Sequence, residues 1–116
     1  MNDVEVYDGT VLEVYSGDDI IAMLDLKVEG LHKKMRLRLS GVDTPNGIGA
    51  AADSKAGLIR SDIRRICQNK QIRVTVVAKQ GTKWVATVEV HRDGGLFNIN
   101  EYLINQGYKF KRERTE

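Results

Sequence analysis

The chain has 116 residues, of which 41% are apolar and 29% are charged, and its formal net charge is +2. This length and apolar content fit one compact domain with a single core. No segment reaches the ~20 consecutive apolar residues of a membrane-spanning helix, so we expect no membrane partner.

The N-terminal segment Met1–Glu5 is acidic and lacks the basic and apolar regions of a signal peptide. We therefore expect a cytoplasmic protein, although an exported form whose signal has been removed would have the same sequence. The small positive charge permits a nucleic-acid partner without requiring one. A monomer is the expected oligomeric state.

The first elements in the chain read as β-strands. Residues 4–15 and 20–28 are rich in Val, Ile, Leu and Tyr, and the segment Ser16–Asp19 between them has the composition of a turn. We expect a β-hairpin here. A third strand follows over residues 35–40, where apolar and polar side chains alternate with the period of a half-buried strand. This alternation places Arg38 on the polar face.

The middle of the chain predicts a loop and then a helix. Residues 46–52 contain two glycines and no charge, which favours a mobile loop, and Asp53 or Ser54 can cap the helix that follows. The apolar stripe of this helix comprises Ala56, Ile59, Ile63, Ile66 and Cys67. Cys67 is the only cysteine, and its place on the stripe predicts a thiol in the core.

The last third predicts a strand pair and a short helix. Residues 72–76 and 84–90 alternate around a turn at residues 79–82. Asn98 can cap a final helix, and Gly107 is a plausible terminator. The elements together predict an α+β protein that is mainly β. Its expected fold is a five-stranded OB-fold Greek-key barrel with a helix between strands three and four and a short C-terminal helix.

We place a single domain at residues 1–110 and a charged tail at residues 111–116. The chemistry concentrates in the segment Arg38–Pro45, RLSGVDTP, where a strand runs into a carboxylate, a hydroxyl and the only proline. The planar fork of arginine suits a phosphate, and aspartate oxygen suits a hard cation. The segment therefore predicts binding of a metal-associated phosphodiester.

Three segments resemble the staphylococcal nuclease (thermonuclease-like) family and occur in that family's order. They are Gly17–Ile20 (GDDI), Arg38–Pro45 (RLSGVDTP) and Ile99–Tyr108 (INEYLINQGY), and the resemblance covers residues 8 to 110. It implies a calcium-dependent enzyme that hydrolyses phosphodiester bonds of DNA and RNA by in-line attack of water.

The resemblance also implies roles for individual residues. Asp18 and Asp43 would hold Ca²⁺ or another divalent cation, and Thr44 would add its backbone carbonyl. Arg38 would clamp the phosphate and stabilise the charge that develops on its oxygens. The alternative is a purely structural role, in which both aspartates only form turns and Arg38 is a charge on the surface of the sheet.

Two positions depart from the family pattern. Asn46 stands where the family has its glutamate, and an amide cannot accept a proton from water at neutral pH. Lys83 or Thr82 stands near the place of the second catalytic arginine, and lysine lacks the bidentate fork. Asp19 and Asp53 are the candidate substitutes for the lost carboxylate. Asp19 could instead tighten a metal or hydrogen-bond the loop.

Nucleic acid is the expected partner, either DNA or RNA. Arg38 and Lys83 would contact its backbone, and Trp84 is a candidate for stacking on a base. Most of the other aromatic side chains are needed for the core. His32 and His91 lie in or beside predicted turns without metal-ligand spacing, so we expect them to have no role at the site.

Three classes of function follow from these residues. The preferred hypothesis is a calcium-dependent phosphodiesterase or endonuclease, weakened because its general base is missing. A second is a non-catalytic nucleic-acid-binding module derived from such a nuclease, and a third is an interaction scaffold indifferent to nucleic acid. Metal binding separates the first from the third, and salt-dependent oligonucleotide binding separates the second from the third.

Overall fold

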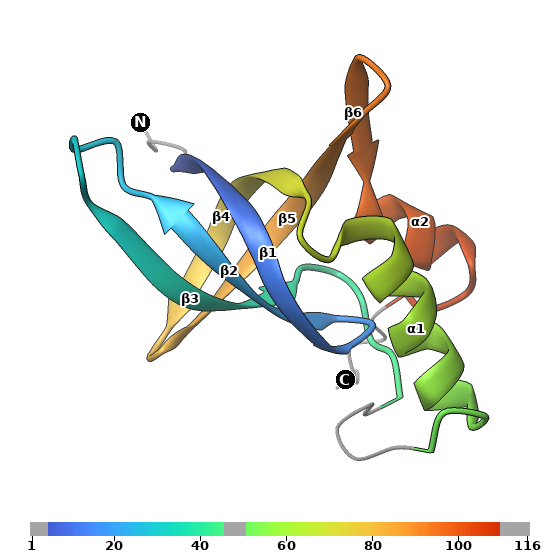
Figure 1. Ribbon diagram of the computed structural model, residues 1–116. Coiled ribbons are helices and arrows are strands. Elements are labelled where there is room, and N and C mark those ends of the chain that lie inside the picture. Colours follow the sequence, from blue (N-terminus) through green and yellow to red (C-terminus); the bar gives the residue numbers. More distant parts are fainter. Residues whose placement is uncertain (1–4, 46–50, 110–116) are drawn as a thin grey trace.

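A computed structural model describes residues 5–45 and 51–109. Asn46, most of the predicted loop and the tail at residues 111–116 lie outside these described residues. The elements in chain order are β1 (Val6–Ser16), β2 (Asp19–Asp25), β3 (His32–Leu39), α1 (Lys55–Cys67), β4 (Gln71–Gln80), β5 (Lys83–Arg92), β6 (Gly95–Asn98) and α2 (Ile99–Asn105) (Figure 1). Neither helix in the described part of the chain is long and apolar enough to cross a membrane.

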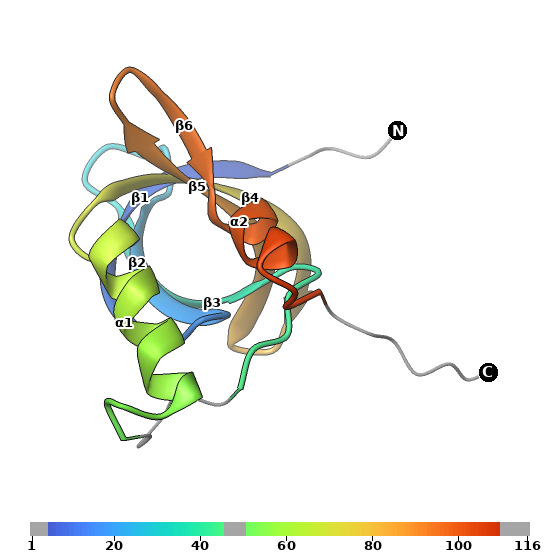
Figure 2. The same ribbon diagram turned by 90° about the vertical axis from the view of Figure 1, so that its right-hand side faces the viewer.

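The described residues form a mainly β structure with two helices and a closed five-stranded barrel. Antiparallel pairing joins β3 to β2, β2 to β1, β1 to β4 and β4 to β5. A parallel pairing of β3 with β5, in which Arg38 lies opposite Val85, closes the ring. Figure 2 looks into this ring and shows the two helices outside it.

Strand β6 was not predicted from the sequence. It forms a hairpin with β5, and the turn between them contains Asp93 and Gly94 with φ angles of 46° and 81°. Asp-Gly is a strong hairpin signal because both central residues of such a turn need positive φ. The four residues of β6 are too few to show a clear alternation, so the strand itself gave little signal.

The barrel interior is filled by the inward-facing side chains of the alternating strands and the apolar stripe of α1. The largest fully buried ones include Ile20, Leu24, Leu37, Leu39, Ile63 and Ile72. Cys67 is also fully buried, which confirms the prediction of a core thiol. Burial raises the pKa of Cys67 to about 12, because the thiolate would lose its hydration.

Side-chain caps begin both helices, as the sequence predicts. Of the two residues that could cap α1, Asp53 and Ser54, the cap is Ser54. Its Oγ accepts a hydrogen bond of 3.0 Å from the Gly57 backbone N–H. At α2, Asn98 Oδ1 accepts one of 2.9 Å from the Glu101 N–H. Gly107 follows α2 with a φ of 100°, a conformation that ends a helix at low cost only for glycine.

Candidate functional site

Strand pairing brings the candidate site together at one end of the barrel. Asp18 lies in the turn between β1 and β2, and its carbonyl accepts a 2.9 Å hydrogen bond from the backbone N–H of Leu39. The next residue, Asp19, lies opposite Arg38 in the β2–β3 ladder. A turn and a strand end separated by some twenty residues are therefore held side by side.

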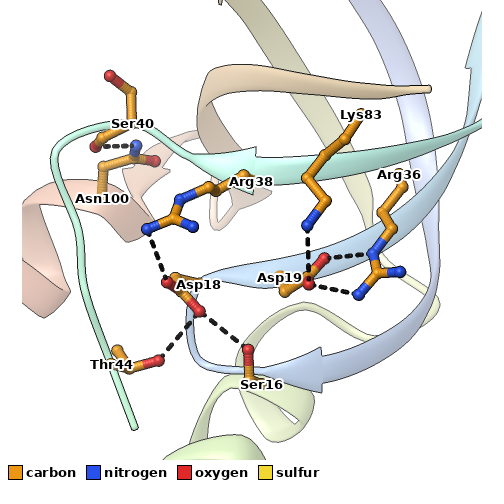
Figure 3. Close-up of polar contacts among 9 residues, drawn as sticks. All are labelled: Ser16, Asp18, Asp19, Arg36, Arg38, Ser40, Thr44, Lys83 and Asn100. Carbon is orange, nitrogen blue, oxygen red and sulfur yellow. Dashed lines mark hydrogen bonds and ion pairs between the residues drawn. The ribbon is translucent and has the colours of Figure 1, made fainter. Parts of the chain in front are cut away.

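Asp18 is the most enclosed charged group of the site, with only 11% of its side chain exposed. Its Oδ1 accepts hydrogen bonds from Ser16 Oγ at 2.9 Å and from Thr44 Oγ1 at 3.2 Å (Figure 3). Its Oδ2 lies 3.8 Å from Arg38 Nη2, which is an ion pair beyond hydrogen-bond distance. Oδ2 therefore keeps capacity to accept a further donor or to bind a cation.

The segment after β3 contributes the other oxygens. Thr44 is buried, with 8% exposed, and the structure shows its hydroxyl in contact with Asp18. Asp43 directly precedes it and is exposed. The Asp43 backbone N–H donates a 2.8 Å hydrogen bond to the carbonyl of Tyr108, beyond the end of α2. The hydroxyl contacts of Ser16 and Thr44 with Asp18 were not predicted from the sequence.

The donor chemistry of these residues fits a hard divalent cation. Asp18, Asp43 and Thr44 offer only oxygen atoms, which Ca²⁺ and Mg²⁺ prefer. Among the described residues, no group of three or more His, Cys, Asp or Glu side chains is placed to hold a metal ion. Since Ca²⁺ takes about six to eight oxygens, water would have to complete a shell that begins with two carboxylates.

Asp19 makes a separate cluster beside the first. Arg36 Nε and Nη2 donate to its Oδ1 and Oδ2 at 2.9 and 2.7 Å, and Lys83 Nζ lies 3.6 Å from Oδ2 (Figure 3). The hydrogen bonds to Asp19 raise the pKa of Arg36, whose guanidinium also lies 5.2 Å from the centre of the Tyr15 ring. Asp19 thus pairs with two cations, and among the described residues its hydrogen bonds and ion pairs join it to Arg36 and Lys83 and not to Asp43.

Arg36 is a candidate that the sequence analysis passed over. It alternates in phase with Arg38 on β3 and lies opposite Lys83 in the parallel β3–β5 ladder. The signal was present in the sequence, because period-two alternation places every second side chain of a strand on the same face. Lys83 itself lies near Arg36 and Asp19, while Thr82 is an exposed turn residue.

Trp84 packs against neighbours that cover its ring. It is half-buried in β5, with the Tyr7 ring centre 5.7 Å away and Lys79 Nζ 4.6 Å from its own centre. Lys79 is held in turn by Glu5 at 2.8 Å. Stacking of a base on the faces of Trp84 that these neighbours cover would require Lys79 or Tyr7 to move.

Three residues singled out earlier, Asp53, His32 and His91, make no hydrogen bond or ion pair with the described site residues Asp18, Arg38 and Thr44. Asp53 is exposed in the turn before α1. His32 and His91 are exposed, and together with Asp8 and Asp25 they line a pocket on the outside of the barrel. Both histidines thus line one pocket although they are far apart in the chain.

Comparisons of the sequence with known protein families and with curated proteins found no match. The interpretation of the site therefore depends on its own geometry and on the motifs described above.

Proposed function

We propose that the protein is a divalent-metal-dependent nuclease of the staphylococcal nuclease type, weakened by the loss of its general base. Its barrel would be an OB-fold Greek key. The observation that carries the proposal is the clustering of Asp18, Arg38 and Thr44, which come from a turn, a strand and a loop. A buried carboxylate that faces an exposed guanidinium suits the recognition of a cation and a phosphate side by side.

Each side chain has a separate task in this proposal. Asp18, Asp43 and Thr44 would hold the cation, which supplies Lewis-acid stabilisation of the phosphate oxygens when it is bound. Arg38, whose side chain is 39% exposed, can reach outward to the nonbridging oxygens and stabilise their charge as water adds to phosphorus and the leaving oxygen departs. The substrate would be DNA, RNA or both.

Two features limit the expected activity. Asn46 has no carboxylate to accept the proton of the attacking water, and a general base contributes ~10²- to 10⁴-fold. Lys83 is paired with Asp19, so its charge is partly neutralised before any phosphate arrives. Asp19 is itself held by Arg36 and is a poor substitute base, because its oxygens already accept two hydrogen bonds.

The second candidate function is a non-catalytic nucleic-acid-binding module on the same barrel. The exposed guanidinium of Arg38 favours it, because phosphate contacts need neither a general base nor a metal. Both candidates use the same surface and differ in whether a bond is broken.

The test is cleavage of labelled single-stranded DNA and RNA in the presence of Ca²⁺, Mg²⁺ or Mn²⁺. We expect slow cleavage by the wild type, loss of it in Asp43→Ala, and a gain of ~10²-fold or more in Asn46→Glu. Glu29→Ala removes an exposed carboxylate from the segment between β2 and β3 and serves as the control, with unchanged activity.

Two other results would change the proposal. A wild type that is inert while Asn46→Glu gains metal-dependent cleavage would favour the binding module as the natural function. If both proteins are inert and calorimetry detects no metal binding that depends on Asp43, the enzymatic proposal fails.

A further inference from the structure

The pocket that His32 and His91 share is an acidic groove. It has a volume of about 660 Å³, and its polar lining consists of Asp8, Thr10, Asp25, His32, Gln71 and His91. Among the described residues that line it there is no lysine or arginine, so nothing in the lining balances the two carboxylates. Ligand pockets of small molecules have volumes of about 300–1,000 Å³, so the groove is large enough for an organic molecule.

The acidic groove is separate from the candidate functional site. Asp19 begins β2 and Asp25 ends it, and six residues span about 20 Å along a strand. In the same way His32 begins β3, while Arg38 lies near its end. Figure 1 shows the arrowhead of β2, at Asp25, beside the start of β1. The groove therefore lies toward the other ends of the strands that carry the candidate site.

Strand pairing sets the two carboxylates of the groove side by side. Gly9 lies opposite Leu24 in the β1–β2 ladder, so Asp8 and Asp25, the next residues along, flank each other where that ladder ends. Cross-strand neighbours have Cβ atoms about 5 Å apart, and like charges in such a pair are destabilising. A cation bound between the two carboxylates would relieve this repulsion.

The carboxylates of the groove also keep free capacity to accept hydrogen bonds. Within the described part of the chain, the Asp8 side chain has no hydrogen-bond or ion-pair partner, although Arg73 lies opposite it in the β1–β4 ladder. Asp25 Oδ1 accepts one hydrogen bond of 2.9 Å, from the backbone N–H of Lys27. A carboxylate can accept about four hydrogen bonds, so both groups can bind further donors.

We propose that the acidic groove binds a small organic dication, of the class of aliphatic diamines and polyamines. An ammonium group has three N–H donors and no acceptor, which matches a lining that offers carboxylates, the Thr10 hydroxyl and the Gln71 amide oxygen. Met23, which is 36% exposed and lies opposite Thr10, gives the methylene chain an apolar contact. The proposal does not depend on the proposed nuclease function, because none of these residues belongs to the candidate site.

The experiment is a titration of the ¹⁵N-labelled protein with 1,4-diaminobutane in EDTA, followed by the amide chemical shifts. We expect the largest shifts at the amides of Thr10, Met23 and Gln71. Asp8→Asn and Asp25→Asn keep the side-chain shape and should each weaken binding about fivefold, the upper end for one exposed ion pair. Butylamine has the same carbon chain and one ammonium group, so it should bind about fivefold more weakly than the diamine.

Asp53→Asn is the matched control, because it removes one exposed carboxylate from the turn before α1 and should leave the affinity unchanged. Equal weakening by Asp53→Asn and Asp8→Asn would overturn the proposal, since it would show only a general attraction of the diamine to the protein. Shifts confined to the amides of Asp18 and Asp43 would overturn it too, by placing the amine in the candidate site.

A metal ion is the other possible occupant of two neighbouring carboxylates. In a second titration without EDTA, Ca²⁺ should leave the amides of Thr10 and Gln71 unshifted at concentrations where the diamine shifts them. If Ca²⁺ shifts these amides at lower concentration than the diamine, the groove is a metal site and the proposal fails. The nuclease assay gives a separate answer, because Asp8→Asn should cleave at the rate of the wild type whether or not the diamine binds.

Discussion

Asn100 links the site loop to the barrel through a buried amide. Its Oδ1 accepts a 2.9 Å hydrogen bond from the Val88 N–H, and its Nδ2 donates to the carbonyls of Ser40 at 2.9 Å and Ala86 at 3.1 Å. The residue is 4% exposed. Because Ser40 begins the segment that leads to Asp43, the amide of α2 fixes where that segment leaves β3 (Figure 3).

Replacing this amide should destabilise the protein. Asn100→Ala leaves the buried Val88 N–H without its partner, and a buried unsatisfied polar group costs about 1–3 kcal/mol. We expect the free energy of unfolding, measured by urea denaturation, to fall by about that amount. Asn105→Ala, at an exposed position of the same helix, should change it by less than about 0.5 kcal/mol. Equal stability of the two variants would contradict this role of Asn100.

At the scale of elements, helix α1 packs onto the turn that carries Asp18. A Cβ atom placed on Gly17 would lie 2.6 Å from Ile59 Cγ2 and 2.9 Å from Thr44 Cγ2. Atoms at those distances overlap, so the turn, the helix and the site loop can meet only if residue 17 has no side chain. This close approach explains why glycine precedes the enclosed carboxylate.

Gly17→Ala should therefore disturb the packing of three elements at once. Overpacking of this kind costs about 1–3 kcal/mol, and we expect that loss in the free energy of unfolding. Gly95→Ala is the control, because the nearest atom to its new Cβ would be 4.0 Å away. Removing the clashing methyl with Ile59→Ala should make the Gly17 substitution less costly in a double-mutant cycle. Additive effects of the two substitutions would argue against the contact.

At the scale of the whole molecule, the far end of the chain supports the site. Beyond α2, Lys109 forms a β-bridge with Val42, and the Tyr108 carbonyl accepts the hydrogen bond from the Asp43 N–H. Tyr108 also packs against the core, and Lys55 at the start of α1 lies over its ring at 5.6 Å. The segment that carries Asp43 is thus held by Asn100 of α2 at Ser40 and by Tyr108 and Lys109 at Asp43 and Val42.

Two truncations separate this support from the rest of the C-terminus. The reference is a chain that ends after Lys109, the last residue that the structure describes. One that ends after Gly107 loses the two backbone contacts and the burial of Tyr108, and we expect a loss of about 2 kcal/mol or more. Differential scanning calorimetry makes the comparison. Identical unfolding temperatures for the two fragments would show that Tyr108 and Lys109 contribute nothing.

Local features of the fold were predictable from the sequence because short segments determine them. Ser54 and Asn98 cap helices through side chains that reach only three residues ahead, and Gly107 ends α2 by a conformation of its own backbone. The strands that alternate for five residues or more were recognised. β6, with four residues, was missed.

The sequence by itself determined the longer strands and the two helices in chain order, the inward and outward faces of those strands, and the residue types that suit a cation and a phosphate. Only the tertiary structure decided which charges meet. Asp19 could have turned towards the segment that carries Asp43, and instead it pairs with Arg36 and Lys83. Such pairings join residues from separate strands, so they depend on the register and closure of the barrel, which no local pattern specifies.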